Sequence, residues 1–177
     1  AKIAGIEMCW SYNRQYDTRY FAVMPTNCYG PRDNYDLRNA HVLPALIRRF
    51  HEAKVGDHRS VEVWGTGSVW REFLYVEDAA EGILLAAERY DESEPVNLGS
   101  GMEISIEELV HLIVRLTGFE GEIVLDTSKP DGQPRRCLDT SRAEQLFGFK
   151  AQTLFEEGLQ KTIEWYRSTL SVQHVED

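Results

Sequence analysis

The stretch Tyr20-Phe-Ala-Val-Met-Pro25-Thr-Asn-Cys-Tyr-Gly-Pro31 decides the fold class of this chain. Its first five residues form an apolar, strand-like run, and the heptad Pro25–Pro31 that follows is polar and rich in turn-forming residues. In open α/β sheets, ligands bind beyond the carboxyl ends of the strands, so the heptad is a candidate wall of a binding site. Taken alone, an ordinary β-turn with incidental polar residues explains it equally well.

The rest of the chain alternates between strand-like and helix-like segments, which predicts an α/β fold. Ser105 and Glu108 form a predicted capping box, and Gly118 is a predicted helix stop. The pair Gly65 and Gly67 lacks the third glycine of a dinucleotide-binding turn and has no helical pattern after it, so we interpret it as a hairpin-like turn. We expect helices at about 1–16, 42–54, 77–90, 106–117 and 154–168, and a short one that starts at 139. We expect strands at about 20–24, 61–64, 73–76, 95–98 and 122–125. The last residues, 169–177, should form a frayed tail.

Composition excludes several classes of function. The 177 residues carry a net charge of −10, which argues against a non-specific nucleic-acid surface but not against an anionic small ligand held by a few local arginines. No apolar run approaches the roughly 20 residues of a membrane helix, and no signal peptide precedes the first helix. Three cysteines without a short ligand spacing fit reduced thiols of a cytoplasmic protein. The histidines show no ligand spacing, so we predict no metal.

Three further blocks follow the heptad in order. They run from His41 to Phe50 (HVLPALIRRF), from Trp64 to Asp78 (WGTGSVWREFLYVED) and from Lys129 to Pro134 (KPDGQP). Together with the heptad they resemble the extended short-chain dehydrogenase/reductase family acting on nucleotide sugars, most closely its epimerase/reductases of GDP-4-keto-6-deoxy-mannose. The Asn-x-Tyr-Gly-Pro pattern is shared across the wider family, whereas the first and third blocks point more narrowly. The resemblance covers essentially the whole chain.

The resemblance implies the C-terminal part of such an enzyme: the end of a Rossmann-type parallel sheet plus a smaller α/β substrate-binding domain. Residues 1–60 would be the remnant of the NADP-binding domain, with a stub of the catalytic helix and the start of the substrate region. Residues 61–177 would mainly bind the sugar nucleotide, with one returning Rossmann strand and helix at about 73–98.

The first predicted helix has no N-cap and no initiator methionine, so we expect the chain to begin inside a helix of a longer protein. The glycine-rich loop and the catalytic tyrosine would then lie outside it, and we expect the isolated chain to be inactive. The family implies a homodimer for the parent protein, whereas the oligomeric state of this chain stays open.

Lys2 matches the lysine of the family's Tyr-x-x-x-Lys signature, in which the ammonium lowers the tyrosine pKa and binds the cofactor ribose. From position alone, a solvated terminal lysine explains it better. His41 matches the family's acid/base for epimerisation next to a ketone, which suits imidazole, whereas without the family a capping or surface histidine is favoured. In the family, the matching histidine works with a cysteine as the second acid/base group, and that cysteine would lie in the other half of the enzyme. Cys28 is a departure at a position that is usually apolar. The resemblance assigns NADP(H) contacts to Pro25, Thr26, Asn27 and Cys28, with Lys2 and His41.

A nucleotide sugar carries a diphosphate, for which guanidinium groups are the fitting partners. The family pattern selects Arg49 and Arg71, although helical phase cannot separate Arg48 from Arg49. Trp64 would stack on the sugar or base, or simply belong to the core. Asp131 and Arg136 match a further substrate-contacting loop.

The implied activity is NADPH-dependent epimerisation and reduction of GDP-4-keto-6-deoxy-D-mannose. Two alternatives stay open. One is another NDP-sugar epimerase or 4,6-dehydratase of the same family, and the other is a non-catalytic module that binds GDP-sugars or a partner chain.

Overall fold

The computed structural model describes residues 1–173 and confirms the α/β class. Its helices are α1 (Lys2–Tyr16), α2 (Val42–Val55), α3 (Val76–Arg89), α4 (Ile106–Thr117), α5 (Ser141–Phe147) and α6 (Phe155–Gln173). Its strands are β1 (Val23–Pro25), β2 (Asn27–Tyr29), β3 (Ser60–Trp64), β4 (Trp70–Tyr75), β5 (Val96–Leu98), β6 (Glu103–Ser105), β7 (Glu122–Asp126) and β8 (Arg135–Arg136).

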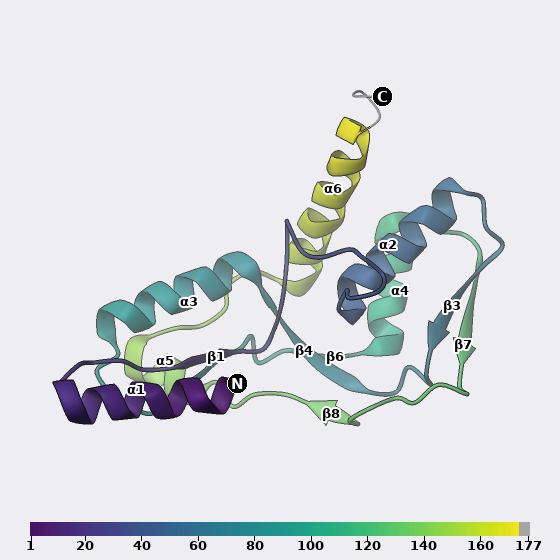
Figure 1. Ribbon diagram of the computed structural model, residues 1–177. Helices are drawn as coiled ribbons and strands as arrows, with labels where there is room; N and C mark the ends of the chain where they lie inside the picture. The colour runs from purple at the N-terminus through teal and green to yellow at the C-terminus, as the bar shows by residue number, and fades with distance from the viewer. Residues whose placement is uncertain (174–177) are drawn as a thin grey trace.

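Strand β4 is the centre of the arrangement. It pairs in parallel with β2 and β8 and antiparallel with β6, while β1 pairs with β5 and β3 with β7, both in parallel. Figure 1 shows β4 running diagonally between one group made of α1, α3, α5 and β1 and another made of α2, α4, β3 and β7. Helix α6 packs on β4 and α4.

Two hydrophobic cores lie on either side of β4. One gathers buried side chains of α2, α4 and α6, and the other gathers those of α3, β5 and α5. Successive residues of a strand point to opposite faces. Accordingly, Phe73 and Tyr75 belong to the first core and Leu74 to the second. The functional division at residue 60 stays a prediction, because packing does not show which part binds which ligand.

The helix signals in the sequence are confirmed. The Ser105 hydroxyl accepts the Glu108 N–H at 3.1 Å and the Glu108 carboxylate accepts the Ser105 N–H at 3.0 Å, so the capping box is complete. Gly118 ends α4 with a φ of 71°, in the left-handed region that favours glycine. Helix α1 forms as predicted, but none of its residues is buried.

The heptad Pro25–Pro31 is not the ordinary β-turn that was one of its two possible interpretations. It contains the end of β1 and all of β2, and the expected strand at 20–24 starts only at Val23, where pairing with Val96 begins. Between the strands, the Thr26 N–H donates to the Leu98 carbonyl at 2.9 Å. The chain bends at Gly30, where a Cβ atom would collide with the Val76 side chain.

Two further expectations are wrong. Gly65 and Gly67 do form a turn, with φ values of 88° and 79°, but it is no hairpin, because β3 and β4 pair with other strands. The tail expected at 169–177 is helical up to Gln173, and residues 174–177 lie outside the described part. Within residues 1–173 no helix has the length and apolar character needed to span a membrane.

Candidate functional site

The segment from Pro25 to Cys28 forms one side of the candidate site. Asn27 Nδ2 donates to the Glu72 carbonyl at 2.9 Å and Thr26 Oγ1 donates to the same oxygen at 3.4 Å. These two side chains therefore bind β4 rather than pointing at a ligand. The Cys28 residue as a whole is exposed, but its thiol is partly covered by neighbouring groups. This partial burial, and after it the charge of Asp33, raises the pKa of the thiol. A raised thiol pKa leaves little thiolate near neutral pH, which makes Cys28 less reactive than an ordinary thiol.

His41 is the N-cap residue of α2, with extended backbone angles of −68° and 166°. Its side chain makes no cap hydrogen bond, so the capping role that the sequence left open is not what this imidazole does. Lys2 is the exposed first residue of α1. Among residues 1–173 no hydrogen bond or ion pair joins Lys2 to any other candidate residue, so its family role stays a prediction.

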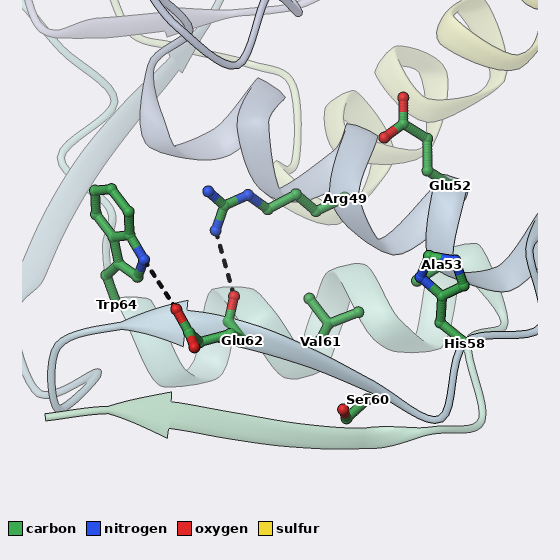
Figure 2. Close-up of a pocket in the computed structure, with 8 residues that line it drawn as sticks. All are labelled: Arg49, Glu52, Ala53, His58, Ser60, Val61, Glu62 and Trp64. Atoms are coloured by element: carbon green, nitrogen blue, oxygen red, sulfur yellow. Dashed lines mark hydrogen bonds between the residues drawn. The ribbon is translucent and has the colours of Figure 1, made fainter.

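Arg48 and Arg49 have different surroundings. Arg48 forms an ion pair with Glu52 at 2.7 Å and donates to the Tyr35 carbonyl at 3.0 Å. Arg49 extends toward Trp64, its guanidinium carbon 5.6 Å from the ring centroid, and Nη1 donates to the Glu62 carbonyl at 3.3 Å (Figure 2). The geometry thus leaves Arg49, not Arg48, facing the cavity.

Trp64 is not a core residue, since 59% of it is exposed. Its indole N–H donates to the Glu62 carboxylate at 3.2 Å, and it forms one end of a cavity of about 430 Å³ between α2 and β3 (Figure 2). Lys129 Nζ also lies 5.6 Å from the ring centroid. An exposed indole can stack on a planar or sugar ligand, and the two neighbouring cations would favour an anionic one.

Arg71 and Arg136 are brought together by the sheet, since they are register partners in β4 and β8. Arg71 Nη1 donates to the carbonyls of Trp70 and Gln133, both at 2.7 Å, which fixes the guanidinium. The exposed Arg136 side chain has no hydrogen bond or ion pair within the described part of the chain. Two guanidinium groups on adjacent strands suit a diphosphate.

Asp131 is occupied by contacts within the protein. Its carboxylate accepts the Thr66 N–H at 2.6 Å and the Thr66 hydroxyl at 2.9 Å. A Cβ atom on Gly65 would collide with the same carboxylate. Asp131 therefore holds the turn after Trp64, and its contact with substrate stays a prediction.

Sequence reasoning missed Glu72, a carboxylate with 0% exposure. Oε1 accepts the Gly101 N–H at 2.9 Å and Oε2 accepts the Leu138 N–H at 2.8 Å. The backbone carbonyl of Glu72 also accepts the hydrogen bond from Asn27. Glu72 therefore joins β4 to β2 and to the segments that contain Gly101 and Leu138. The signal was present in the sequence, since an acidic residue followed directly by Phe-Leu-Tyr in a strand needs a buried partner.

A nicotinamide beside residues 25–28 stays a prediction, because the backbone there takes part in strand pairing. Strand β1 pairs with β5, β2 pairs with β4, and between them the Thr26 N–H donates to the Leu98 carbonyl. The Lys2 side chain is exposed. Cys28, Gly30 and Asp33 line a cavity of about 220 Å³. Within residues 1–173 no three His, Cys, Asp or Glu side chains are grouped to hold a metal ion.

Comparisons with known proteins identify the family of the chain. The model of the NAD dependent epimerase/dehydratase family matches residues 1–99. The GDP-L-fucose synthase of Sinorhizobium fredii is 47% identical over 171 residues, which are 97% of this chain and 54% of that protein. The chain thus spans about half the length of the curated relatives it matches.

Solved structures show the same fold. A GDP-L-fucose synthetase from Naegleria fowleri bound to NADP matches with a TM-score of 0.88 at 29% identity, over 94% of this chain and 54% of that one. A GDP-6-OMe-4-keto-L-xylo-heptose reductase from C. jejuni matches with a TM-score of 0.87 at 33% identity, over 96% and 60%.

Proposed function

Because the chain belongs to the NAD-dependent epimerase/dehydratase family, we propose that it carries the substrate side of a GDP-L-fucose synthase. Such an enzyme converts GDP-4-keto-6-deoxy-D-mannose into GDP-L-fucose by epimerisation and reduction with NADPH. The observation that carries the proposal is the exposed Trp64 with Arg49 and Lys129 each 5.6 Å from its ring, at the edge of an open cavity. We also propose the cytoplasm as its location and a homodimer for the complete protein, both from the family resemblance.

In this proposal the arginines hold the diphosphate. Arg71 is fixed by two carbonyl contacts, and Arg136 beside it is unpaired among the described residues. Preorganised guanidinium groups bind phosphate with two N–H donors each, which sets the orientation of the ligand as well as its affinity. Trp64 offers a flat apolar surface for the base or the sugar.

His41 would move the protons of epimerisation. Its imidazole is exposed and makes no cap hydrogen bond, so it can exchange a proton with a carbon next to the C4 ketone on one face of the sugar. The group that exchanges the proton on the opposite face would be the cysteine that the family resemblance assigns to the other half of the enzyme. Lys2 would lower the pKa of a neighbouring tyrosine. That tyrosine would give its phenol proton to the C4 oxygen, and the Lys2 ammonium would stabilise the phenolate that remains. NADPH, when bound, supplies the hydride that reduces C4. Residues 25–28 would border the nicotinamide through backbone groups.

Binding tests the substrate side directly. Isothermal titration of the 177-residue chain with GDP, UDP and inorganic phosphate should show binding of GDP, weaker binding of UDP and no measurable binding of phosphate. Equal affinity for GDP and UDP would remove the support for a GDP-sugar ligand.

Turnover tests the reaction and separates the alternatives. The complete protein that carries this chain should consume NADPH when it receives GDP-4-keto-6-deoxy-D-mannose. Consumption with another GDP-linked keto sugar alone would favour a reductase of the kind solved from C. jejuni, and an NDP-sugar reaction without NADPH consumption would favour an epimerase or a 4,6-dehydratase. GDP binding without any turnover would favour a non-catalytic module.

A further inference from the structure

Asp33 lies in the loop between β2 and α2, and only one of its two carboxylate oxygens accepts a hydrogen bond within residues 1–173. Oδ1 accepts the Asn34 N–H at 2.7 Å. Oδ2 is buried, and no hydrogen bond reaches it within residues 1–173. A buried acceptor without a partner is costly, so this oxygen calls for a hydrogen-bond donor close by.

His41 stands at the other end of the same loop. The loop folds back on itself because the Asp36 carbonyl accepts the N–H groups of Asn39 at 2.9 Å and Ala40 at 2.7 Å. The backbone of His41 enters α2, while its imidazole makes no cap bond and is free to turn. Within residues 1–173 the His41 imidazole and Asp33 Oδ2 thus make no hydrogen bond, although both belong to one short, folded loop.

Electrostatics agrees with this neighbourhood. Burial raises the pKa of Asp33, whereas the Asn34 N–H and then the charge of His41 lower it. The other titratable groups that face this carboxylate are the Cys28 thiol and the Tyr35 hydroxyl. Burial raises the pKa of each, and the charge of Asp33 is the second cause.

We propose that Asp33 is a positioning residue for His41: its unpartnered carboxylate oxygen accepts one imidazole N–H and thereby fixes which ring nitrogen faces the ligand. A neutral imidazole has one N–H and one basic nitrogen, so holding the first by a carboxylate presents the second as the base. Only the last consequence, proton exchange with a keto sugar, rests on the proposed function.

The competing partner of Asp33 is the Tyr35 hydroxyl, which is also buried without a hydrogen bond. The Tyr35 ring stacks on Tyr166 with centroids 4.3 Å apart, which restricts where its hydroxyl can go. A Tyr35→Phe variant removes this hydroxyl and keeps the stacking, so it separates the two possibilities.

The test is nuclear magnetic resonance of the full chain labelled with ¹⁵N-histidine, in which two-bond ¹H–¹⁵N correlations report the tautomer of each imidazole. We expect one dominant tautomer at His41 and, in Asp33→Ala, a shift toward the mixture that free histidine shows. Asp36→Asn, in the same loop but paired with Arg38, should leave the His41 pattern unchanged, as should Tyr35→Phe.

A reciprocal measurement protects against a variant that fails to fold. In His41→Gln the carboxyl carbon of Asp33 should titrate at higher pH than in the parent chain, because the cation that lowers its pKa is gone. An unchanged His41 tautomer in Asp33→Ala, or a titration of Asp33 that moves in Tyr35→Phe but not in His41→Gln, overturns the proposal. Neither readout requires turnover or GDP binding, so failure of the proposed function would be seen separately.

Discussion

Replacing Glu72 should destabilise the protein far more than replacing a carboxylate on its surface. The side chain is fully buried and each of its oxygens accepts one backbone N–H, from Gly101 and from Leu138. Glu72→Gln keeps one acceptor but turns an amide N–H₂ toward the other backbone N–H. One charge-assisted hydrogen bond is lost, worth about 1.5–3 kcal/mol, and one donor is left facing a donor. We therefore expect a loss of about 2–4 kcal/mol in the free energy of unfolding.

Urea denaturation followed by tryptophan fluorescence measures this loss. With a urea slope of about 2 kcal/mol/M, typical of proteins in this size range, the midpoint should fall by about 1–2 M. Glu103→Gln is the matched control, because Glu103 faces Glu72 across the β4–β6 ladder. The Glu103 side chain is 21% exposed and pairs at 2.7 Å with Arg135, which is 68% exposed. Because water reaches this ion pair, Glu103→Gln should cost about 1 kcal/mol, less than the change at Glu72. Equal losses of unfolding free energy in the two variants would refute the conclusion that the buried hydrogen bonds of Glu72 hold β4 to its neighbouring segments.

Three further predictions concern the site itself. Arg49→Gln should weaken GDP binding about 10-fold or more in isothermal titration, from the loss of a charge-assisted contact, whereas Arg48→Gln should leave the affinity unchanged. Trp64→Ala should abolish any GDP-induced fluorescence change but shift the urea midpoint little, because the side chain is exposed. Iodoacetamide should modify Cys28 slowly at pH 8, because the raised pKa of its thiol leaves little thiolate. Asp33→Asn removes a negative charge that raises this pKa, so it should speed the modification. Mass spectrometry of the modified peptide measures both rates.

Local signals in the sequence predicted the helices well. The Ser105–Glu108 capping box and the Gly118 stop depend only on residues within a few positions of one another, so the pattern suffices. The strands were harder, because a three-residue strand such as β2 exists through its partner rather than through its own composition. The hairpin expected at Gly65–Gly67 was wrong for the same reason: turn chemistry is local, but the choice of pairing partner is not.

The ligand roles of the site residues stay predictions, but the structure shows which of them lie together. Arg49 lies near the Trp64 ring, and the strand register places Arg71 beside Arg136. The role of Asp131 in holding Thr66 could not be seen from the sequence, because the two residues are 65 positions apart and meet only after β3 and β7 pair.

The alternation along β4 has a consequence for how the molecule opens. Since Phe73 and Tyr75 anchor one core and Leu74 the other, neither core can loosen without disturbing the strand on which the other rests. We expect the amides of both cores to exchange with deuterium as one cooperative unit rather than as two independent foldons. A ligand that restrains Arg71 at the start of this strand would then slow exchange in α5, which contributes no residue to the candidate site.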